Sequence, residues 1–452
     1  MSESSIIFPD GFLWGCGSSS YQIEGAYDLD GKGESIWDRF SKTPGKTYNG
    51  ETGNSACNHY HRYAEDIDLM VELGLKVYRF SISWSRVFPQ GKGSLNAKGI
   101  DFYDKLIDKL LAKNIQPFAT LYHWDLPQAL QENGGWENRD TIKYFQDYTG
   151  EISRQFGDRI AGWVTQSEPA VASFLGHYQG IHAPGVKNLK AALQVSHHLL
   201  LSHGFAVARL RENIKNNAEI GISLNLTPSH PASNSKKDRE AAERNFAHFC
   251  GWFLEPIFNK RYPEELETTY QNTGLFPMIE PDDLKIIAAD IDFLGVNYYM
   301  RDIVRNAPYK SIWGLETIKP PSADYTAMGW EIYPDGLHEI LEFVNDCYHP
   351  KKIYITENGA AFRDNMSENG EVHDPRRVSY LRSHFAQAHR AIQKGIPLAG
   401  YFVRSLLDGF EWVEGYTKRF GIIYVDYPTQ KRILKDSAHW YKKVIEHNGL
   451  TD

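Results

Sequence analysis

Eight short runs of β-branched and aromatic residues recur along the whole chain, and they constrain its fold more than any other feature. Runs of this length and composition predict buried strands, and the stretches between them show the periodicity of amphipathic helices. Strands that alternate with helices favour a parallel sheet with crossover helices. The predicted strands cover residues 13–18, 77–83, 117–122, 162–166, 219–226, 293–297, 353–356 and 399–405.

Parallel strands in this number can close into a cylinder, and the sequence therefore predicts an α/β fold of the (β/α)8 TIM-barrel type. Helices of the outer ring are predicted at residues 60–73, 100–113, 141–156, 189–213, 238–258, 335–347 and 376–394. Three segments rich in Gly, Pro, Asn and charge, 31–58, 307–325 and 362–375, are predicted as long loops. In a barrel such loops form the walls of the active-site pocket.

The length of the chain leaves the number of domains open. A chain of 452 residues with 42% apolar content can bury a large core, and length alone is compatible with two or three domains. Single α/β barrels with insertions also reach this length. Because the sequence contains no internal repeat, no low-complexity tract and no linker rich in Pro and Ser, we expect one barrel domain over residues 1–452.

The charge pattern and the N-terminus argue against several classes of partner. A net charge of −8, from 49 basic and 57 acidic residues, gives no electrostatic reason to bind nucleic acid or an anionic membrane. The N-terminus has neither a basic n-region nor an apolar h-region, and no segment approaches about 18 consecutive apolar residues. We therefore expect a soluble, cytoplasmic protein. The sequence leaves its oligomeric state open.

Cysteines and histidines indicate neither a disulfide framework nor a metal site. The four cysteines lie far apart and form no Cys-x-x-Cys pair, so we expect packed thiols. His59 and His61 lie at an apparent helix start without a matching set of acidic ligands. We therefore expect neither a metal nor another cofactor.

Two glutamates stand in distinctive contexts, Glu168 before Pro169 and Glu357 before an Asn-Gly pair. Each ends a short apolar, β-branched run, which is where an α/β barrel exposes its functional groups. Most glutamates are solvated surface charges, so neither residue is diagnostic alone. Two carboxylates that face each other across a sugar are, however, the minimal equipment for cleaving a glycosidic bond.

Ten short motifs, in the same order along the chain, carry a resemblance to a known family. They are Phe12-Leu-Trp-Gly15, Ser20-Tyr-Gln-Ile-Glu-Gly25, His59-Tyr-His-Arg62, Tyr78-Arg-Phe-Ser-Ile-Ser-Trp84, Leu121-Tyr-His-Trp-Asp-Leu-Pro127, His182-Ala-Pro-Gly185, Asn297-Tyr-Tyr299, Gly329-Trp-Glu-Ile-Tyr-Pro334, Thr356-Glu-Asn-Gly359 and Phe410-Glu-Trp412. Together they resemble glycoside hydrolase family 1, the β-glucosidase and β-galactosidase family of retaining exo-glycosidases. The resemblance covers nearly the whole chain.

The resemblance implies roles for the two glutamates and for two neighbours. It makes Glu168 the general acid/base and Glu357 the nucleophile, which requires opposite protonation states at neutral pH. Arg79 matches the family arginine beside the nucleophile, and Tyr299 resembles the phenol that donates a hydrogen bond to it. For Arg79, a buried structural ion pair is the alternative.

The resemblance also implies a set of sugar-binding residues. The residues that match the family's contacts to the hydroxyls of the terminal sugar are Gln22, His123, Trp124, Glu411 and Trp412. Asn297 resembles a residue near the acid/base, and Trp330 resembles a wall of the aglycone site. Outside this shared context, His123 and Trp124 are more typical of core packing.

Two positions depart from the family pattern inside the expected sugar site. Ser167 replaces the family asparagine that donates to the 2-hydroxyl, and Arg404 replaces the tryptophan under the sugar ring. An arginine brings a permanent charge and five donors, so it must find an anion. That anion could be Glu357 or Glu168, or it could belong to a charged or substituted sugar, for example one substituted at the 2-position.

The predicted function is that of a β-glucosidase-like, retaining exo-β-glycosidase. Its substrate is expected to be a small-molecule glycoside or an oligosaccharide. Ser167 and Arg404 suggest that the donor sugar is substituted or acidic. One alternative is an enzyme for an anionic glycoside such as a uronide or a sulfated sugar. A 6-phosphate is disfavoured because Glu411 would repel it. Another alternative is a sugar-binding homologue whose turnover is weakened or lost.

Overall fold

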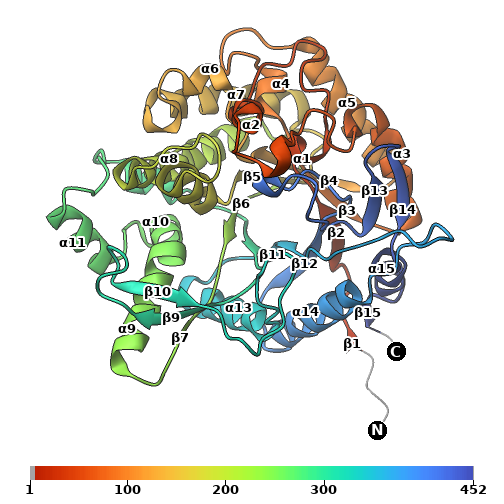
Figure 1. The fold of residues 1–452 in the computed structure, drawn as a ribbon. Coiled ribbons are helices and arrows are strands. Elements are labelled where there is room, and N and C mark those ends of the chain that lie inside the picture. Colours follow the sequence, from red (N-terminus) through yellow and green to blue (C-terminus); the bar gives the residue numbers. More distant parts are fainter. Residues whose placement is uncertain (1–5, 451–452) are drawn as a thin grey trace.

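The computed structural model describes residues 6–450, and its centre is a closed barrel of eight parallel strands (Figure 1). Going round the barrel, the strands are β2 (Leu13–Gly17), β3 (Val77–Ser81), β4 (Gln116–Tyr122), β5 (Gly162–Ser167), β6 (Glu219–Asn225), β8 (Phe293–Asn297), β11 (Ile353–Asn358) and β12 (Leu398–Arg404). Strand β12 then pairs with β2 and closes the cylinder. The predicted (β/α)8 barrel is confirmed.

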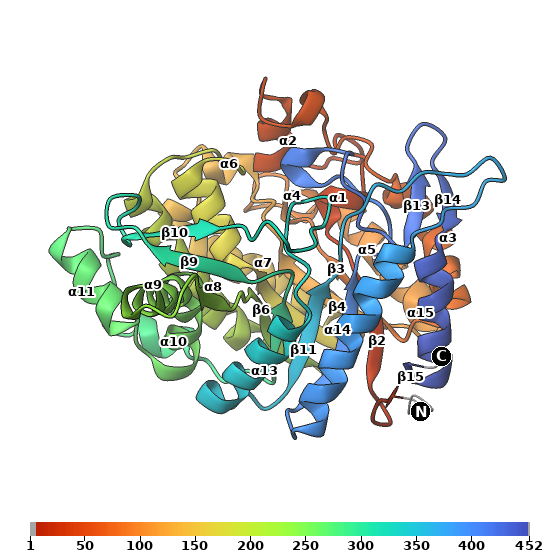
Figure 2. The ribbon, with the colours of Figure 1, turned by 60° about the horizontal axis from the view of Figure 1, so that its bottom comes forward.

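Helices surround the barrel, and the longest of them follow the predicted amphipathic stretches (Figure 2). They are α3 (His59–Glu72), α5 (Ala97–Ala112), α7 (Asp140–Phe156), α8 (Leu189–Asn213), α13 (Asp335–Tyr348) and α14 (Pro375–Gln393); a further long helix is α15 (Asp436–His447). The stretch predicted as one helix at 238–258 forms α9 (Lys236–Phe246) and α10 (Trp252–Asn259), separated by a π-helical turn, η4 (Ala247–Gly251). Helix α15 was not predicted.

Shorter elements lie mostly in the connections. The short helices are α1 (Ser20–Ile23), α2 (Ile36–Lys42), α4 (Trp84–Val87), α6 (Gln128–Gln131), α11 (Glu264–Asn272) and α12 (Asp283–Ile287), with helical turns η1 (Tyr48–Gly50), η2 (Gly135–Glu137), η3 (Val171–Gln179) and η5 (Trp412–Glu414). A side sheet has the order β10 (Leu315–Ile318), β9 (Asp302–Asn306), β7 (Ser229–Pro231), and two pairs join β13 (Ile423–Asp426) to β14 (Lys431–Leu434) and β1 (Ile6–Ile7) to β15 (Gly449–Leu450).

Two of the segments predicted as loops contain regular structure. Segment 31–58 contains α2, which begins with a capping box because the Ser35 hydroxyl accepts from the Asp38 N–H while the Asp38 carboxylate accepts from the Ser35 N–H. Segment 307–325 contains β10, whose partial exposure hides the strand periodicity.

Bulky side chains fill the barrel at the end opposite the two glutamates. Val77, Phe118, Val164, Phe293, Tyr354 and Phe402 form this buried cluster. Strand glycines make room for its rings: a Cβ at Gly162 would lie 2.5 Å from the Phe118 ring. The predicted site residues lie at the opposite, carboxyl end of the strands, which is where barrels of this kind place their active sites.

A buried ionic network ties the carboxyl-end loops to α15. The Lys435 ammonium donates to Asp364 at 2.5 Å and to Asp408 at 2.8 Å, and Arg377 contacts the same Asp364 at 2.7 Å. All four side chains are buried. The network joins the loop after β11, the loop after β12 and the start of α15.

Further features of the described part of the chain bear on the expected partners. Between residues 6 and 450, no helix is both long and apolar enough to cross a membrane. In that same range no group of three or more His, Cys, Asp or Glu side chains could hold a metal ion. Three cysteines are buried free thiols, but Cys347 is exposed, so the prediction of packed thiols was wrong for that residue.

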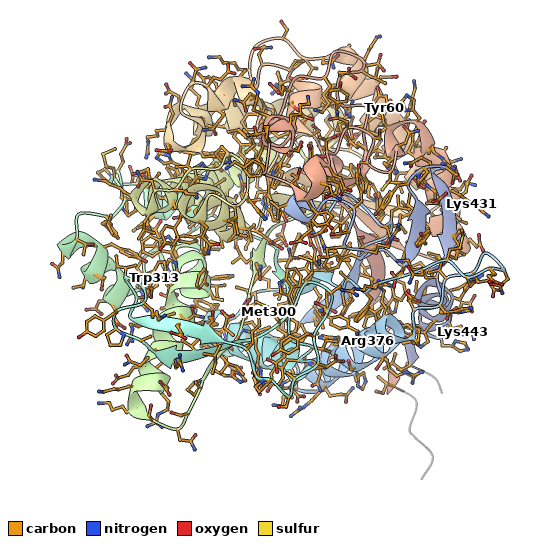
Figure 3. The ribbon with its side chains drawn as sticks, in the orientation of Figure 1. Tyr60, Met300, Trp313, Arg376, Lys431 and Lys443 are labelled. Atoms are coloured by element: carbon orange, nitrogen blue, oxygen red, sulfur yellow. The ribbon has the colours of Figure 1, made fainter. Side chains whose placement is uncertain are left out.

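Replacing Lys435 with Met should lower the free energy of unfolding by about 3–5 kcal/mol, because Asp364 and Asp408 would lose a buried cation. Urea denaturation followed by tryptophan fluorescence measures this change. The matched control is Lys431→Met on β14, since Lys431 lies exposed at the surface (Figure 3). Equal stability of the two variants would contradict the role given to the network.

Candidate active site

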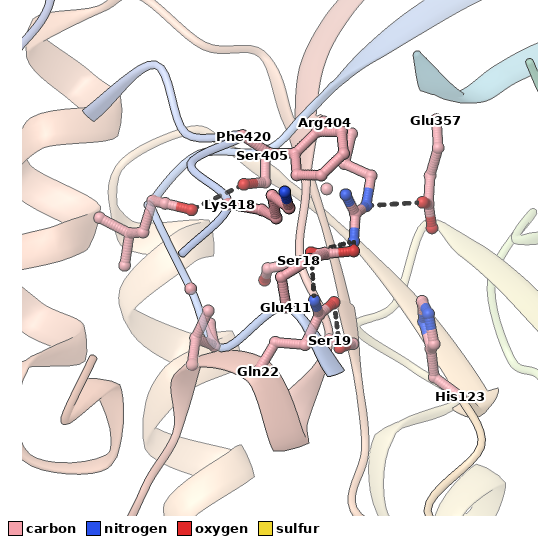
Figure 4. Close-up of a pocket in the computed structure, with 14 residues that line it drawn as sticks. Ser18, Ser19, Gln22, His123, Glu357, Arg404, Ser405, Glu411, Lys418 and Phe420 are labelled. Carbon is pink, nitrogen blue, oxygen red and sulfur yellow. Dashed lines mark hydrogen bonds and ion pairs between the residues drawn. The ribbon is translucent and has the colours of Figure 1, made fainter. Parts of the chain in front are cut away.

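The carboxyl ends of the barrel strands bring the predicted site residues to one pocket. Arg79 lies in β3, Glu168 directly follows β5, Asn297 ends β8, Glu357 lies in β11 and Arg404 ends β12. Figure 4 shows Arg404 between the side chains of Glu357 and Glu411. Residues far apart in the sequence therefore meet because the carboxyl ends of their strands lie at the same end of the closed barrel.

Glu357 is buried among donors that favour its ionised form. Arg79 Nη1 donates to its Oε1 at 2.7 Å, and the Tyr299 hydroxyl donates to its Oε2 at 2.5 Å. Burial opposes ionisation, but the charges of Arg79 and Arg404 and the Tyr299 hydrogen bond outweigh it and lower the pKa to about 2. Glu357 is therefore a carboxylate at neutral pH.

Glu168 has the opposite electrostatics. Burial, followed by the negative charge of Glu357, raises the pKa of Glu168 to about 8. The Asn297 amide donates to Glu168 Oε1, which partly offsets this rise. At neutral pH the pocket thus holds one protonated and one ionised carboxyl group, as the resemblance requires.

Hydrogen bonds fix the orientation of Asn297. Its Oδ1 accepts from the Ser223 hydroxyl at 2.8 Å and from the Thr356 hydroxyl at 2.6 Å. Because the oxygen is held in this way, the Asn297 NH2 group points toward Glu168. Ser223 and Thr356 were not predicted as site residues, since nothing in a strand sequence distinguishes a buried hydroxyl that orients a neighbour.

Arg79 also connects to the residue before Glu168. Its Nη2 donates to Ser167 Oγ at 2.9 Å, and its Nε donates to Thr120 Oγ1 at 3.0 Å. Trp124 Nε1 donates to the Ser167 carbonyl at 2.9 Å. The Ser167 side chain is therefore engaged with Arg79.

The predicted sugar-binding residues form a second polar group. Gln22 Nε2 donates to Glu411 Oε2 at 3.0 Å, and the Trp124 and Trp412 rings lie 4.5 Å apart between centroids. Burial lowers the pKa of His123 to about 3, so the imidazole is neutral. His123 Nδ1 and Trp412 Nε1 are buried without a hydrogen-bond partner in the described chain. Both side chains line the same cavity as the two glutamates.

Arg404 forms ion pairs with two carboxylates of the protein, Glu411 and Glu357. Its Nη2 donates to Glu411 at 2.8 Å and 3.1 Å, and its Nε lies 3.1 Å from Glu357 Oε2. The guanidinium lies over the Phe420 ring, 4.3 Å from the centroid. Of the alternatives left open by the sequence, pairing with Glu357 is observed, while the contact with Glu411 and the support from Phe420 were not predicted.

Three of these residues have a backbone that bulky side chains seldom adopt. The φ angles are 74° at Trp124, 50° at Glu168 and 51° at Trp412. Positive φ at such residues is costly and clusters at functional sites, where the surrounding structure holds it. All three residues line the same pocket.

A cavity of about 410 Å³ opens beside the two glutamates. Trp330 lines it and packs against Tyr299, with ring centroids 5.0 Å apart. Its other apolar lining was not predicted, and it comprises Val171, Leu175, Ile181, Met300, Met328 and Val413. A smaller cavity of about 20 Å³ is lined by Gly409, Phe420 and Arg404, among others.

Comparison with known proteins agrees with this geometry. The sequence model for Glycosyl hydrolase family 1 matches residues 4–450. "Beta-glucosidase A" from Acetivibrio thermocellus is 51% identical over 450 residues, covering 99% of this chain and 100% of that protein. "Beta-glucosidase A" from Thermotoga maritima is 50% identical over 451 residues, covering 98% of this chain and 99% of that protein.

Solved structures give the same result. The family 1 β-glucosidase structure from Thermotoga maritima has a TM-score of 0.97 and 48% sequence identity, and the match covers 100% of both chains. A second structure of the Thermotoga maritima β-glucosidase, in complex with deoxynojirimycin, has a TM-score of 0.96 and 48% identity, covering 99% of this chain and 100% of the other. The chain therefore belongs to glycosyl hydrolase family 1, whose members are O-glycosyl hydrolases.

Proposed function

We propose that this protein is a retaining β-glucosidase that releases a terminal sugar from a small glycoside or oligosaccharide. The observation that carries the proposal is the convergence of two buried carboxyl groups on one pocket, Glu168 beside the Asn297 amide and Glu357 held by Arg79 and Tyr299. The names of the relatives, which are β-glucosidases over nearly the full length of this chain, support the substrate class.

In the first step, a Glu357 oxygen attacks the anomeric carbon while Glu168 gives its proton to the glycosidic oxygen. The bond to the aglycone breaks, and the sugar is left as an ester of Glu357. Arg79 and Tyr299 hold the attacking carboxylate in place. Such retention requires the two carboxyl groups to lie about 5–5.5 Å apart.

In the second step, Glu168 acts as the base. Esterification removes the negative charge of Glu357, so one cause of the raised pKa of Glu168 disappears and its ionised form is favoured. The Glu168 carboxylate then takes a proton from water, the water oxygen attacks the anomeric carbon, and Glu357 leaves as a carboxylate. The Asn297 amide keeps Glu168 oriented during both steps.

The residues around the two glutamates suit a neutral sugar. His123, Trp412 and Glu411 all line the large cavity, where an indole N–H can donate to a sugar hydroxyl and a carboxylate can accept from one. The substituted or acidic donor expected from Ser167 and Arg404 gains no support, because Ser167 binds Arg79 and the Arg404 charge is matched by carboxylates. The relatives also carry β-glucosidase names.

Replacing Glu357 with Gln should lower kcat for an aryl β-glucoside by more than about a thousandfold, because the amide cannot form the glycosyl ester. Replacing Glu168 with Ala should lower it by about 10²–10⁴-fold for poor leaving groups. Steady-state kinetics measure both losses, and a mechanism-based fluorosugar should label Glu357 in peptide mass spectrometry.

The matched control is Glu316→Gln on β10, since this glutamate does not line the pocket. It should keep the activity of the unmodified protein. Labelling of a different carboxylate, or turnover that survives in Glu357→Gln, would rule out the assigned nucleophile.

The pH profile of kcat/KM should follow the two carboxyl groups. Activity requires protonated Glu168, so it should fall as the pH rises through about 8, whereas protonation of Glu357 removes activity only near pH 2.

Replacing Asn297 with Ala removes a hydrogen bond that lowers the pKa of Glu168, so the basic limb of the pH profile should move to higher pH. Asn216→Ala, at the other end of the barrel, should leave the limb in place. A downward shift in Asn297→Ala would contradict this assignment.

A further inference from the structure

We propose that Arg404 is a specificity-determining residue: by bridging Glu357 and Glu411, it satisfies oxygens that would otherwise depend on the substrate, and it makes the donor site tolerant of sugars that lack one hydroxyl. This inference rests on the proposed function, because it assumes that the pocket binds the terminal sugar of a glycoside. It concerns the demand for individual hydroxyls rather than the chemistry of the two glutamates.

The bridge joins groups from separate parts of the fold. Arg404 ends β12, Glu357 lies in the neighbouring strand β11, and Glu411 lies in the loop after β12. Figure 4 shows the guanidinium contacting both carboxylates at once. Its Nε faces Glu357, and its Nη2 donates to both oxygens of Glu411.

The surroundings keep the bridge in place. Arg404 is only 8% exposed, and both carboxylates that it contacts are also buried. Phe420 supports the guanidinium from one side, at a distance typical of a cation–π contact. Water competes weakly for a buried ion pair of this kind, so the pairing persists unless a ligand replaces it.

The acceptor capacity of Glu411 shows what the bridge does. A carboxylate offers about four acceptor positions. Arg404 Nη2 engages both oxygens, and Gln22 Nε2 engages Oε2 as well. About one position remains for a sugar hydroxyl. With an apolar side chain at position 404, Glu411 would depend on the substrate for most of its hydrogen bonds.

This difference controls discrimination among sugars. A site built to bind a hydroxyl rejects an analogue without it chiefly because the buried polar groups of the site are then left unpaired. In this protein Glu411 keeps Arg404 and Gln22 as partners when the hydroxyl is missing. The loss of that hydroxyl therefore leaves no unpaired charge behind.

One donor nitrogen of Arg404 takes no part in the bridge. Its Nη1 is buried and has no hydrogen-bond partner within residues 6–450. Arg404 as a residue lines both the large and the small cavity. A tryptophan at this position would instead offer a stacking face and a single N–H donor.

The test compares kcat/KM for 4-nitrophenyl β-glucoside with kcat/KM for its 2-, 3-, 4- and 6-monodeoxy analogues. In the unmodified protein, removal of the hydroxyl that Glu411 binds should lower kcat/KM by about tenfold or less. In Arg404→Met, which keeps an apolar stem over Phe420 but removes the donors, the same removal should cost about a hundredfold or more. Equal penalties in the two proteins would overturn the proposal.

Lys418→Met is the matched control. Lys418 also lines the small cavity, but it donates to the Ala327 carbonyl at 2.9 Å and lies 3.4 Å from Glu414. Within residues 6–450, Lys418 forms no hydrogen bond or ion pair with Glu357 or Glu411, so the deoxy penalties should match those of the unmodified protein. A penalty that rises equally in Lys418→Met would show a general charge effect and would also overturn the proposal.

Binding measurements separate this inference from the proposed function. Calorimetric dissociation constants for deoxynojirimycin and its 6- and 4-deoxy analogues test the same penalties without turnover, with Arg404→Trp as a second variant. A folded protein that hydrolyses no β-glucoside would refute the proposed function. Even then, binding would decide the role of Arg404 through the factor by which loss of a hydroxyl raises the dissociation constant. A larger factor in Arg404→Met and Arg404→Trp than in the unmodified protein would support the proposal, and an unchanged factor would refute it.

Discussion

The active-site geometry depends on one buried carboxylate that is held ionised. Glu357 is stabilised by Arg79 and Tyr299, and its negative charge in turn helps to keep Glu168 protonated. The barrel supplies the framework for this arrangement, because Arg79, Glu168 and Glu357 come from strands that meet only when the sheet closes. Burial strengthens every one of these interactions, since little water competes with them.

Arg404 adds a second cation to this set. A buried arginine without a counter-ion would be very unfavourable, and here two carboxylates share its charge. Because Arg404 and Gln22 donate to Glu411, this carboxylate is already largely hydrogen-bonded before a sugar hydroxyl binds. The chain thus combines the two glutamates of its family with a different way of holding the sugar-binding carboxylate.

Local periodicity was sufficient to predict the barrel, but it could not predict the smaller elements or the path of the loops. Strand β8 has the predicted bounds, because its residues are all buried and an apolar run, Phe293 to Val296, leads to the polar Asn297 at its end. Strand β7 was missed because its three residues are partly exposed and follow no clear pattern. The pairing of Arg404 with Glu411 depends on how the loop after β12 folds back, and no local sequence pattern determines that.

Titration of the two glutamates by carbon-13 NMR, on protein labelled at the glutamate carboxyl groups, tests the central claim most directly. Glu168 should titrate near pH 8 and Glu357 near pH 2 in the free protein. Once a fluorosugar has esterified Glu357, the pKa of Glu168 should fall, because the neighbouring negative charge has been removed. If both carboxyl groups titrated between pH 4 and 5, like exposed glutamates (about 4.3), or if the pKa of Glu168 did not respond to esterification, the proposed coupling between them would be wrong.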